Sequence, residues 1–275
     1  RLQSSNPNNS YHLNPPDGYA DSTYIQFTNQ SAYLNRGMVY AGGNDGMLHA
    51  FNLGVLEQQW TDQQTYEKAR LTGSDLGKEM WSFIPKNSLP YLKYLAERNY
   101  CHLFYVDLPP YIVDASVNGN PTDTKDINSW RTILIGGMGI GGACRDTGAS
   151  CSDCVKTPVA GQGFSSYFAL DITDPLNPTL LWEFTNAELG FTTSGPALIR
   201  IGDSSKNGKW FAVFASGPTG PIDTTYHQFM GRSDQNLKLF VLDLKTGSLL
   251  RTIDTGISNA FAGSIVDTML DTDRG

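Results

Sequence analysis

MVYAGGNDGMLHAF, at residues 38–51, is the stretch that decides the fold class of this 275-residue chain. Two apolar runs, 38–43 and 47–51, flank the turn sequence Asn-Asp-Gly at 44–46. Asp-Gly between two such runs favours a β-hairpin, because the tight turn requires positive φ and these residues tolerate it. The regular structure is therefore expected to begin with two antiparallel strands.

The same pattern recurs along the chain. After the first copy closes at 77–83, apolar strand-like runs return at 131–137, 167–171 and 180–184, and again at 210–217, 239–244 and 249–253. A further short strand lies ahead of each later copy, at 104–117, 195–201 and 263–269. Four-stranded units that recur at such intervals indicate an all-β fold of the β-propeller type. A β-sandwich would not predict this internal repetition.

The repeat also sets the expected organisation. Blade-like units are predicted at about 38–85, 104–184 and 195–256, with the start of another at 263. Closed propellers typically have about four to eight blades, so about half of one is expected here. Residues 88–98 carry leucines near helical spacing and predict one short inserted helix. Residues 1–35, rich in Asn, Ser and Pro, are expected to form an extended arm before the propeller domain at 36–275.

Composition limits the partners. Hydrophobic residues make up 40% of the chain and charged residues 17%, which is typical of a folded protein. The net charge of −7 and the lack of a basic cluster argue against a nucleic-acid partner. No apolar run is long enough to span a bilayer, and residues 1–6 lack a signal-peptide pattern. If the protein is exported, its signal is expected outside this chain.

The four cysteines are Cys101, Cys144, Cys151 and Cys154. An even number in an exported protein favours two disulfides, with the pairing open. The spacing of Cys151 and Cys154 would also suit zinc, but no second pair of ligands at similar spacing accompanies them. Disulfides are therefore the favoured interpretation.

Several segments resemble one known family, the PilC/PilY type IV pilus biogenesis and tip adhesin proteins, in their C-terminal β-propeller domain. They are GGNDGMLHAFNL (42–53), GKEMWSFIPKNSLPYLKYLAERNY (77–100), FYVDLPPYIVDASV (104–117), WRTILIGGMGIGG (130–142) and SYFALDITDPLNPTLLWEF (166–184). The resemblance covers most of residues 38–270 and leaves out the amino-terminal arm.

This resemblance implies a modified, quinoprotein-like propeller of seven blades when complete. It implies a non-enzymatic protein at the pilus tip, exported to the cell envelope and surface, that promotes pilus assembly, opposes retraction and mediates adhesion. The implied partners are minor pilins of the tip complex and a host or abiotic surface. No organic cofactor is expected.

Two features depart from the family pattern. Residues 143–165 hold three of the cysteines and resemble an insertion in a surface loop. The family's calcium loop corresponds to Asp267, Asp271 and Asp273, but Met269 stands at an oxygen-ligand position and the expected glycine is missing. The alternatives are a degenerate calcium loop and a solvated turn, and the incomplete ligand set favours the turn.

The alternative function is a quinone-dependent dehydrogenase, because similar blade turns occur in those propellers. Such enzymes carry adjacent cysteines at the cofactor, and none are adjacent here. Residues 137–142 match G-x-G-x-x-G, yet loop-like sequence follows instead of the helix that a dinucleotide requires. Trp81, Trp182 and Trp210 are expected to fill the core rather than to stack on a cofactor. The sequence therefore predicts a protein without catalytic activity.

Overall fold

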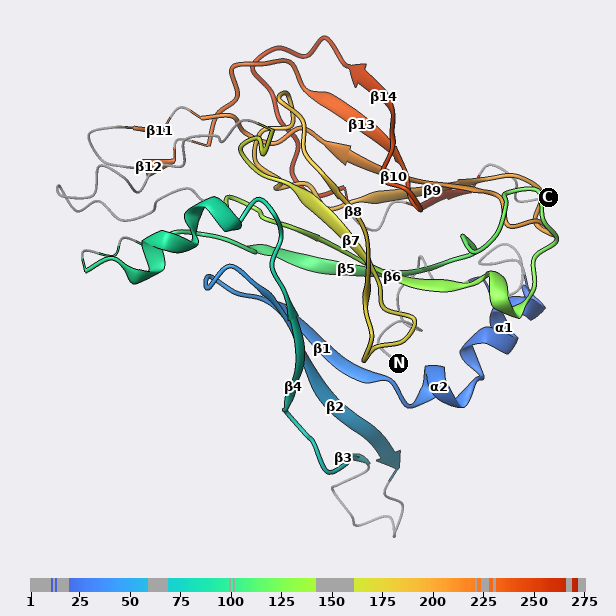
Figure 1. Cartoon of the computed structure of the whole chain (residues 1–275). Helices are drawn as coiled ribbons and strands as arrows, with labels where there is room; N and C mark the ends of the chain where they lie inside the picture. Colours follow the sequence, from blue (N-terminus) through green and yellow to red (C-terminus); the bar gives the residue numbers. More distant parts are fainter. Residues whose placement is uncertain are drawn as a thin grey trace, which may run out of the picture.

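The computed structural model describes residues 11, 13, 20–58, 69–98, 100, 102–141, 161–220, 222–223, 228–229, 231–265 and 269–271. Three main sheets, antiparallel except for one parallel pair in the third, follow one another along the chain (Figure 1). The all-β prediction is confirmed, and the strands of the repeat lie close to their predicted positions.

The first sheet contains β1 (Gly37–Gly42), β2 (Leu48–Gln58), β3 (Ala69–Thr72) and β4 (Glu79–Phe83). β2 is the central strand and pairs with the other three. Its far end and β3 form a hairpin that projects from the body in Figure 1. This extension was not predicted from the repeat.

The second and third sheets are the predicted four-stranded meanders. The second runs β5 (Leu108–Ala115), β6 (Arg131–Gly137), β7 (Tyr167–Asp171) and β8 (Thr179–Phe184). The third runs β9 (Ala197–Ile201), β10 (Lys209–Ala215), β13 (Lys238–Asp243) and β14 (Leu249–Asp254), while β11 (Ile222–Asp223) and β12 (Gln228–Phe229) form a small separate pair.

The strand expected to open another unit at 263 behaves differently. Residues 263–265 are not in a strand, and β15 (Met269–Asp271) pairs in parallel with β9 as a fifth strand of the third sheet. The inner edge of β9 is open to such pairing, since β10 occupies only its other side. The strand expected to open a new unit therefore pairs with the edge of the third sheet at β9, which the periodicity of the sequence does not predict.

Aromatic side chains hold the three sheets together. Phe83 of the first sheet packs 5.1 Å from Phe168 of the second, and Tyr167 stacks on Phe214 of the third at 3.9 Å. The inserted helix is confirmed as the 3₁₀-helix η3 (Leu89–Ala96), whose Tyr91 is buried between the first and second sheets.

The amino-terminal segment differs from the predicted extended arm. It contains α1 (Ser22–Thr28) and α2 (Ser31–Leu34). Asp21 caps α1 by accepting hydrogen bonds from the Thr23 and Tyr24 amides, which satisfies groups that a helix start leaves unpaired. The rings of Tyr11 and Tyr24 are buried against Trp130, which follows the short 3₁₀-helix η4 (Ile127–Ser129). The extended arm was predicted from the polar composition of this segment, which does not show that its aromatic residues pack on the second sheet.

Candidate functional site

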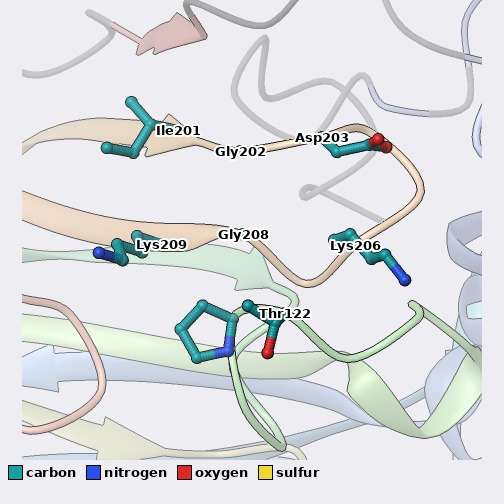
Figure 2. Close-up of a pocket in the computed structure, with 8 residues that line it drawn as sticks. Thr122, Ile201, Gly202, Asp203, Lys206, Gly208 and Lys209 are labelled. Carbon is teal, nitrogen blue, oxygen red and sulfur yellow. The ribbon is translucent and has the colours of Figure 1, made fainter.

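A surface pocket of about 360 Å³ lies between a loop of the second sheet and the β9–β10 hairpin of the third (Figure 2). The residues that line it are Pro121, Thr122, Ile201, Gly202, Asp203, Lys206, Gly208 and Lys209. Gly202 and Gly208 face each other across the hairpin, and a Cβ on Gly202 would lie 3.1 Å from the Gly208 Cα. Because these two glycines have no side chains, only backbone lines the pocket at this point of the hairpin.

Arg200 fixes the turn of the β9–β10 hairpin. This side chain is buried, and its guanidinium donates hydrogen bonds to the carbonyls of Gly202 (3.1 Å), Asp203 (2.8 Å) and Lys206 (2.7 Å). A single guanidinium therefore fixes three backbone groups of one turn, which its planar set of donors makes possible.

Hydrogen bonds join the hairpin to the loop of the second sheet that forms the other wall of the pocket. The amide of Lys125 donates to the Ser205 carbonyl at 2.9 Å, and the amide of Gly208 donates to the Pro121 carbonyl at 2.9 Å. The buried Asn207 side chain donates to two further carbonyls, those of Asn118 and Asn120. Both walls of the pocket are thus fixed to each other by backbone hydrogen bonds.

The charged groups of the pocket do not form a catalytic set. The Asp203 carboxylate accepts a hydrogen bond from the Ser205 amide, and hydrogen bonds from Ser205 lower its pKa. The Lys206 ammonium donates to the Thr124 hydroxyl at 2.9 Å. Among the described residues, nothing places a nucleophile beside a base here.

A second group of charged side chains surrounds His49 on β2. Its Nδ1 lies 2.7 Å from a Glu79 oxygen and its Nε2 lies 2.9 Å from an Asp45 oxygen. The hydrogen bond to Glu79 is the largest of the causes that raise the pKa of His49 above its ordinary value of 6.5. Both ring nitrogens of His49 therefore contact carboxylates. The arrangement is a cross-strand electrostatic contact.

The residues predicted as sites fall largely outside the described part of the chain. Cys101, Cys144, Cys151 and Cys154 lie outside it, as do Asp267 and Asp273. Asp271 is the last residue of β15. Within the described ranges, no group of three or more His, Cys, Asp or Glu residues could hold a metal ion. The disulfide and calcium hypotheses therefore stay predictions.

The glycine run at 137–142 has a structural role in its described part. Gly137 ends β6, and the Gly139 carbonyl accepts hydrogen bonds from the Thr192 amide at 3.0 Å and the Ser165 hydroxyl at 3.2 Å. A Cβ on Gly141 would lie 2.3 Å from the Tyr105 carbonyl oxygen. These glycines allow close backbone approach between neighbouring segments.

The predicted core tryptophans also connect the sheets, which the sequence did not reveal. Trp81 of β4 donates its indole N–H to the Pro175 carbonyl, in the β7–β8 turn, at 2.7 Å. Trp182, at the equivalent place in β8, donates to the Leu244 carbonyl, in the β13–β14 turn, at 2.8 Å. Each tryptophan therefore anchors the turn of the sheet that follows. Trp210 is buried and donates to the Ser116 hydroxyl.

A search for bilayer-spanning helices among the described residues finds none with sufficient length and apolar character.

Comparison with known proteins gives a consistent result. Residues 11–274 match the family described as the PilY1 beta-propeller domain. A type IV pilus biogenesis factor PilY1 homolog from Xylella fastidiosa is 31% identical over 252 residues, which cover 88% of this chain and 15% of that protein. The type IV pilus biogenesis factor PilY1 of Pseudomonas aeruginosa PAO1 is 30% identical over 234 residues, covering 82% of this chain and 14% of that protein.

Among solved structures, the crystal structure of the Pseudomonas aeruginosa PilY1 C-terminal domain is 26% identical, with a TM-score of 0.45, and the match covers 82% of this chain and 33% of that one. The chain thus spans a small part of the length of its curated relatives. The family match covers nearly the whole chain and agrees with the resemblance and the fold class predicted from the repeat. The chain belongs to the PilY1 β-propeller domain family.

Proposed function

We propose that this protein acts in the type IV pilus system as a non-enzymatic factor at the pilus tip. It promotes pilus assembly, opposes retraction and mediates adhesion to a host or abiotic surface. The observation that carries the proposal is the family match over residues 11–274, together with relatives named as type IV pilus biogenesis factors. Its partners are minor pilins, and its location is the cell envelope and surface.

The two pilus roles can be separated in cells. A strain that lacks the gene should lose surface pili, and disabling the retraction motor in that strain should restore them if the protein opposes retraction. If pili stay absent, assembly is the required role. Normal piliation in the deletion strain, with no minor pilin recovered by the full-length protein in pull-downs, would refute the proposal.

The absence of catalysis needs its own assay. We expect no dye reduction with alcohols when the full-length protein is supplied with pyrroloquinoline quinone and calcium. Robust turnover would favour the dehydrogenase alternative.

Calcium and disulfides belong to the same proposal. We propose that Asp267, Asp271 and Asp273 form a solvated turn, with a degenerate calcium loop as the alternative, and that the four cysteines form two disulfides. Calorimetry on the full-length protein tests the first: calcium binding that is unchanged by Asp267→Ala and Asp271→Ala is expected for a solvated turn, and binding lost in the variant would favour the calcium loop. Peptide mapping without reduction tests the second, and four alkylated free thiols would contradict it.

A further inference from the structure

The pocket between the β9–β10 hairpin and the loop of the second sheet has walls that the protein itself holds in place. Arg200 donates hydrogen bonds to three carbonyls of the hairpin turn, and the Gly208 amide donates to the Pro121 carbonyl across the two walls. The volume of about 360 Å³ lies near the low end of the range for ligand sites, roughly 300–1,000 Å³. The pocket therefore suits a short chemical group rather than a large cofactor.

One end of the pocket places an apolar side chain next to a cation (Figure 2). Ile201 of β9 is the register partner of Lys209 of β10, so the two side chains project from the same face of the sheet. The preceding residue, Arg200, is buried on the opposite face, because side chains alternate along a strand. Pro121 lines the same pocket from the second sheet. An apolar group of a ligand can therefore lie between Pro121 and Ile201, beside the Lys209 ammonium.

The charges of the pocket balance at its turn end but not at Lys209. The positive charge of Lys206 favours the ionised form of Asp203, and the Lys206 ammonium donates to the Thr124 hydroxyl at 2.9 Å. The Lys209 side chain is exposed, and its ammonium forms no ion pair within the part of the chain that the structure describes. Two lysines and one aspartate therefore give the pocket a net positive charge, although the whole chain has a net charge of −7.

We propose that this pocket binds a short peptide segment of another protein, in which an apolar side chain lies next to a carboxylate. The apolar side chain packs between Pro121 and Ile201, against the glycine backbone of the hairpin, and the carboxylate pairs with Lys209. Because the chain as a whole is acidic, an acidic segment is attracted to this pocket and repelled by most of the remaining surface. The inference goes beyond the proposed pilus function, since binding of a peptide can be measured without pili.

Saturation-transfer NMR, which detects weak ligands of a large protein, tests the ligand class on the full-length protein. The probe is the peptide Gly-Asp-Leu-Asp-Gly with blocked ends. A peptide with both aspartates replaced by asparagine should bind about fivefold more weakly, as for the loss of one favourable exposed ion pair. A peptide with serine in place of leucine should bind at least about tenfold more weakly, because serine buries little apolar area. Equal binding of the aspartate and asparagine peptides, or no binding of the aspartate peptide, would overturn the proposal.

Variants of the full-length protein test whether the peptide binds in this pocket. Lys209→Glu replaces the cation by a repelling charge and should weaken binding of the aspartate peptide at least about tenfold. Thr122→Trp fills the pocket and should also weaken it. The matched control Lys93→Glu makes the same charge change at an exposed lysine of η3 and should leave the affinity within about twofold. All three side chains are exposed, so the thermal midpoint should not change. Equal losses at Lys93 and Lys209 would overturn the proposal.

Photo-crosslinking in cells tests the source of the segment. A photoreactive residue in place of Thr122 should crosslink to another protein, and mass spectrometry should place the crosslink in a segment with an apolar residue next to Asp or Glu. The crosslink should be lost when Lys209→Glu is added and kept with Lys93→Glu. A crosslink to the same polypeptide, to a second copy of it or to a segment without acidic residues would overturn the proposal, and so would the absence of any crosslink.

Discussion

Replacing Asp114 by Asn tests how the amino-terminal segment is held on the second sheet. The Asp114 carboxylate is fully buried in β5 and accepts hydrogen bonds from the Tyr24 and Tyr33 hydroxyls, each at 2.8 Å, and from the Thr132 hydroxyl at 2.5 Å. An Arg36 nitrogen lies 3.6 Å away. One carboxylate thus connects α1, α2 and the segment before β1 to the sheet.

The charge of Asp114 matters because its neighbours are arranged for an anion. Burial, followed by the charge of Asp114, raises the pKa of the Tyr24 and Tyr33 phenols above their ordinary range, so both stay protonated and donate. Removing one partner of a buried ion pair typically costs about 3–5 kcal/mol. Because Asn keeps the shape and one acceptor, we expect Asp114→Asn to lower the free energy of unfolding by about 3 kcal/mol, the low end of that range.

Urea unfolding followed by tryptophan fluorescence measures this change, because Trp130 packs on Tyr24. Limited proteolysis should cut residues 20–36 earlier in the variant and leave the third sheet intact. In the double variant Arg36→Met, Asp114→Asn, part of the loss should be recovered, since no buried charge is then without its counterion. A loss below about 0.5 kcal/mol, or strictly additive effects, would refute the ion-pair argument.

Three further predictions concern contacts within and between the sheets. Gly247→Ala should destabilise the protein more than Gly256→Ala in thermal unfolding. Both glycines have positive φ, which costs roughly 1–2 kcal/mol for alanine. Only at Gly247 would the new Cβ also meet a side chain, that of Trp182 at 2.4 Å. Trp182→Phe should cost about 1–3 kcal/mol in urea unfolding, because the buried Leu244 carbonyl loses its donor, and an unchanged midpoint would contradict this. The contacts with Glu79 and Asp45 that raise the pKa of His49 stabilise the fold fully below pH 6.5, and this stabilisation is lost as the pH rises through the pKa of His49 in the folded state. His49→Gln should therefore flatten the pH dependence of the urea midpoint.

The strands could be predicted because their signals are local. Asn-Asp-Gly at 44–46 fixes a hairpin, and β6–β8 and β10–β14 repeat the same apolar runs. The helices before β1 could not be predicted from composition, since their stability comes from Tyr24 and Phe27 packing on Trp130, more than a hundred residues away in sequence.

The candidate sites were less predictable than the strands. Asp45 and His49 lie four residues apart across a predicted turn, so their contact could have been expected, but Glu79 joins them only through the β2–β4 pairing. The role of Arg200 could not be predicted, because an arginine in an apolar strand usually reaches solvent. In the structure its guanidinium instead donates to the carbonyls of the hairpin.

The indole contacts hold two of the turns. Trp81 and Trp182 each anchor the turn of the following sheet, so the β7–β8 turn at 172–178 and the β13–β14 turn at 244–248 are each held by a neighbouring sheet. The Gly247 Cα lies against the Trp182 ring, where a Cβ would come within 2.4 Å of the indole. An insertion into the 244–248 turn should therefore disturb the packing of Trp182 as Gly247→Ala does.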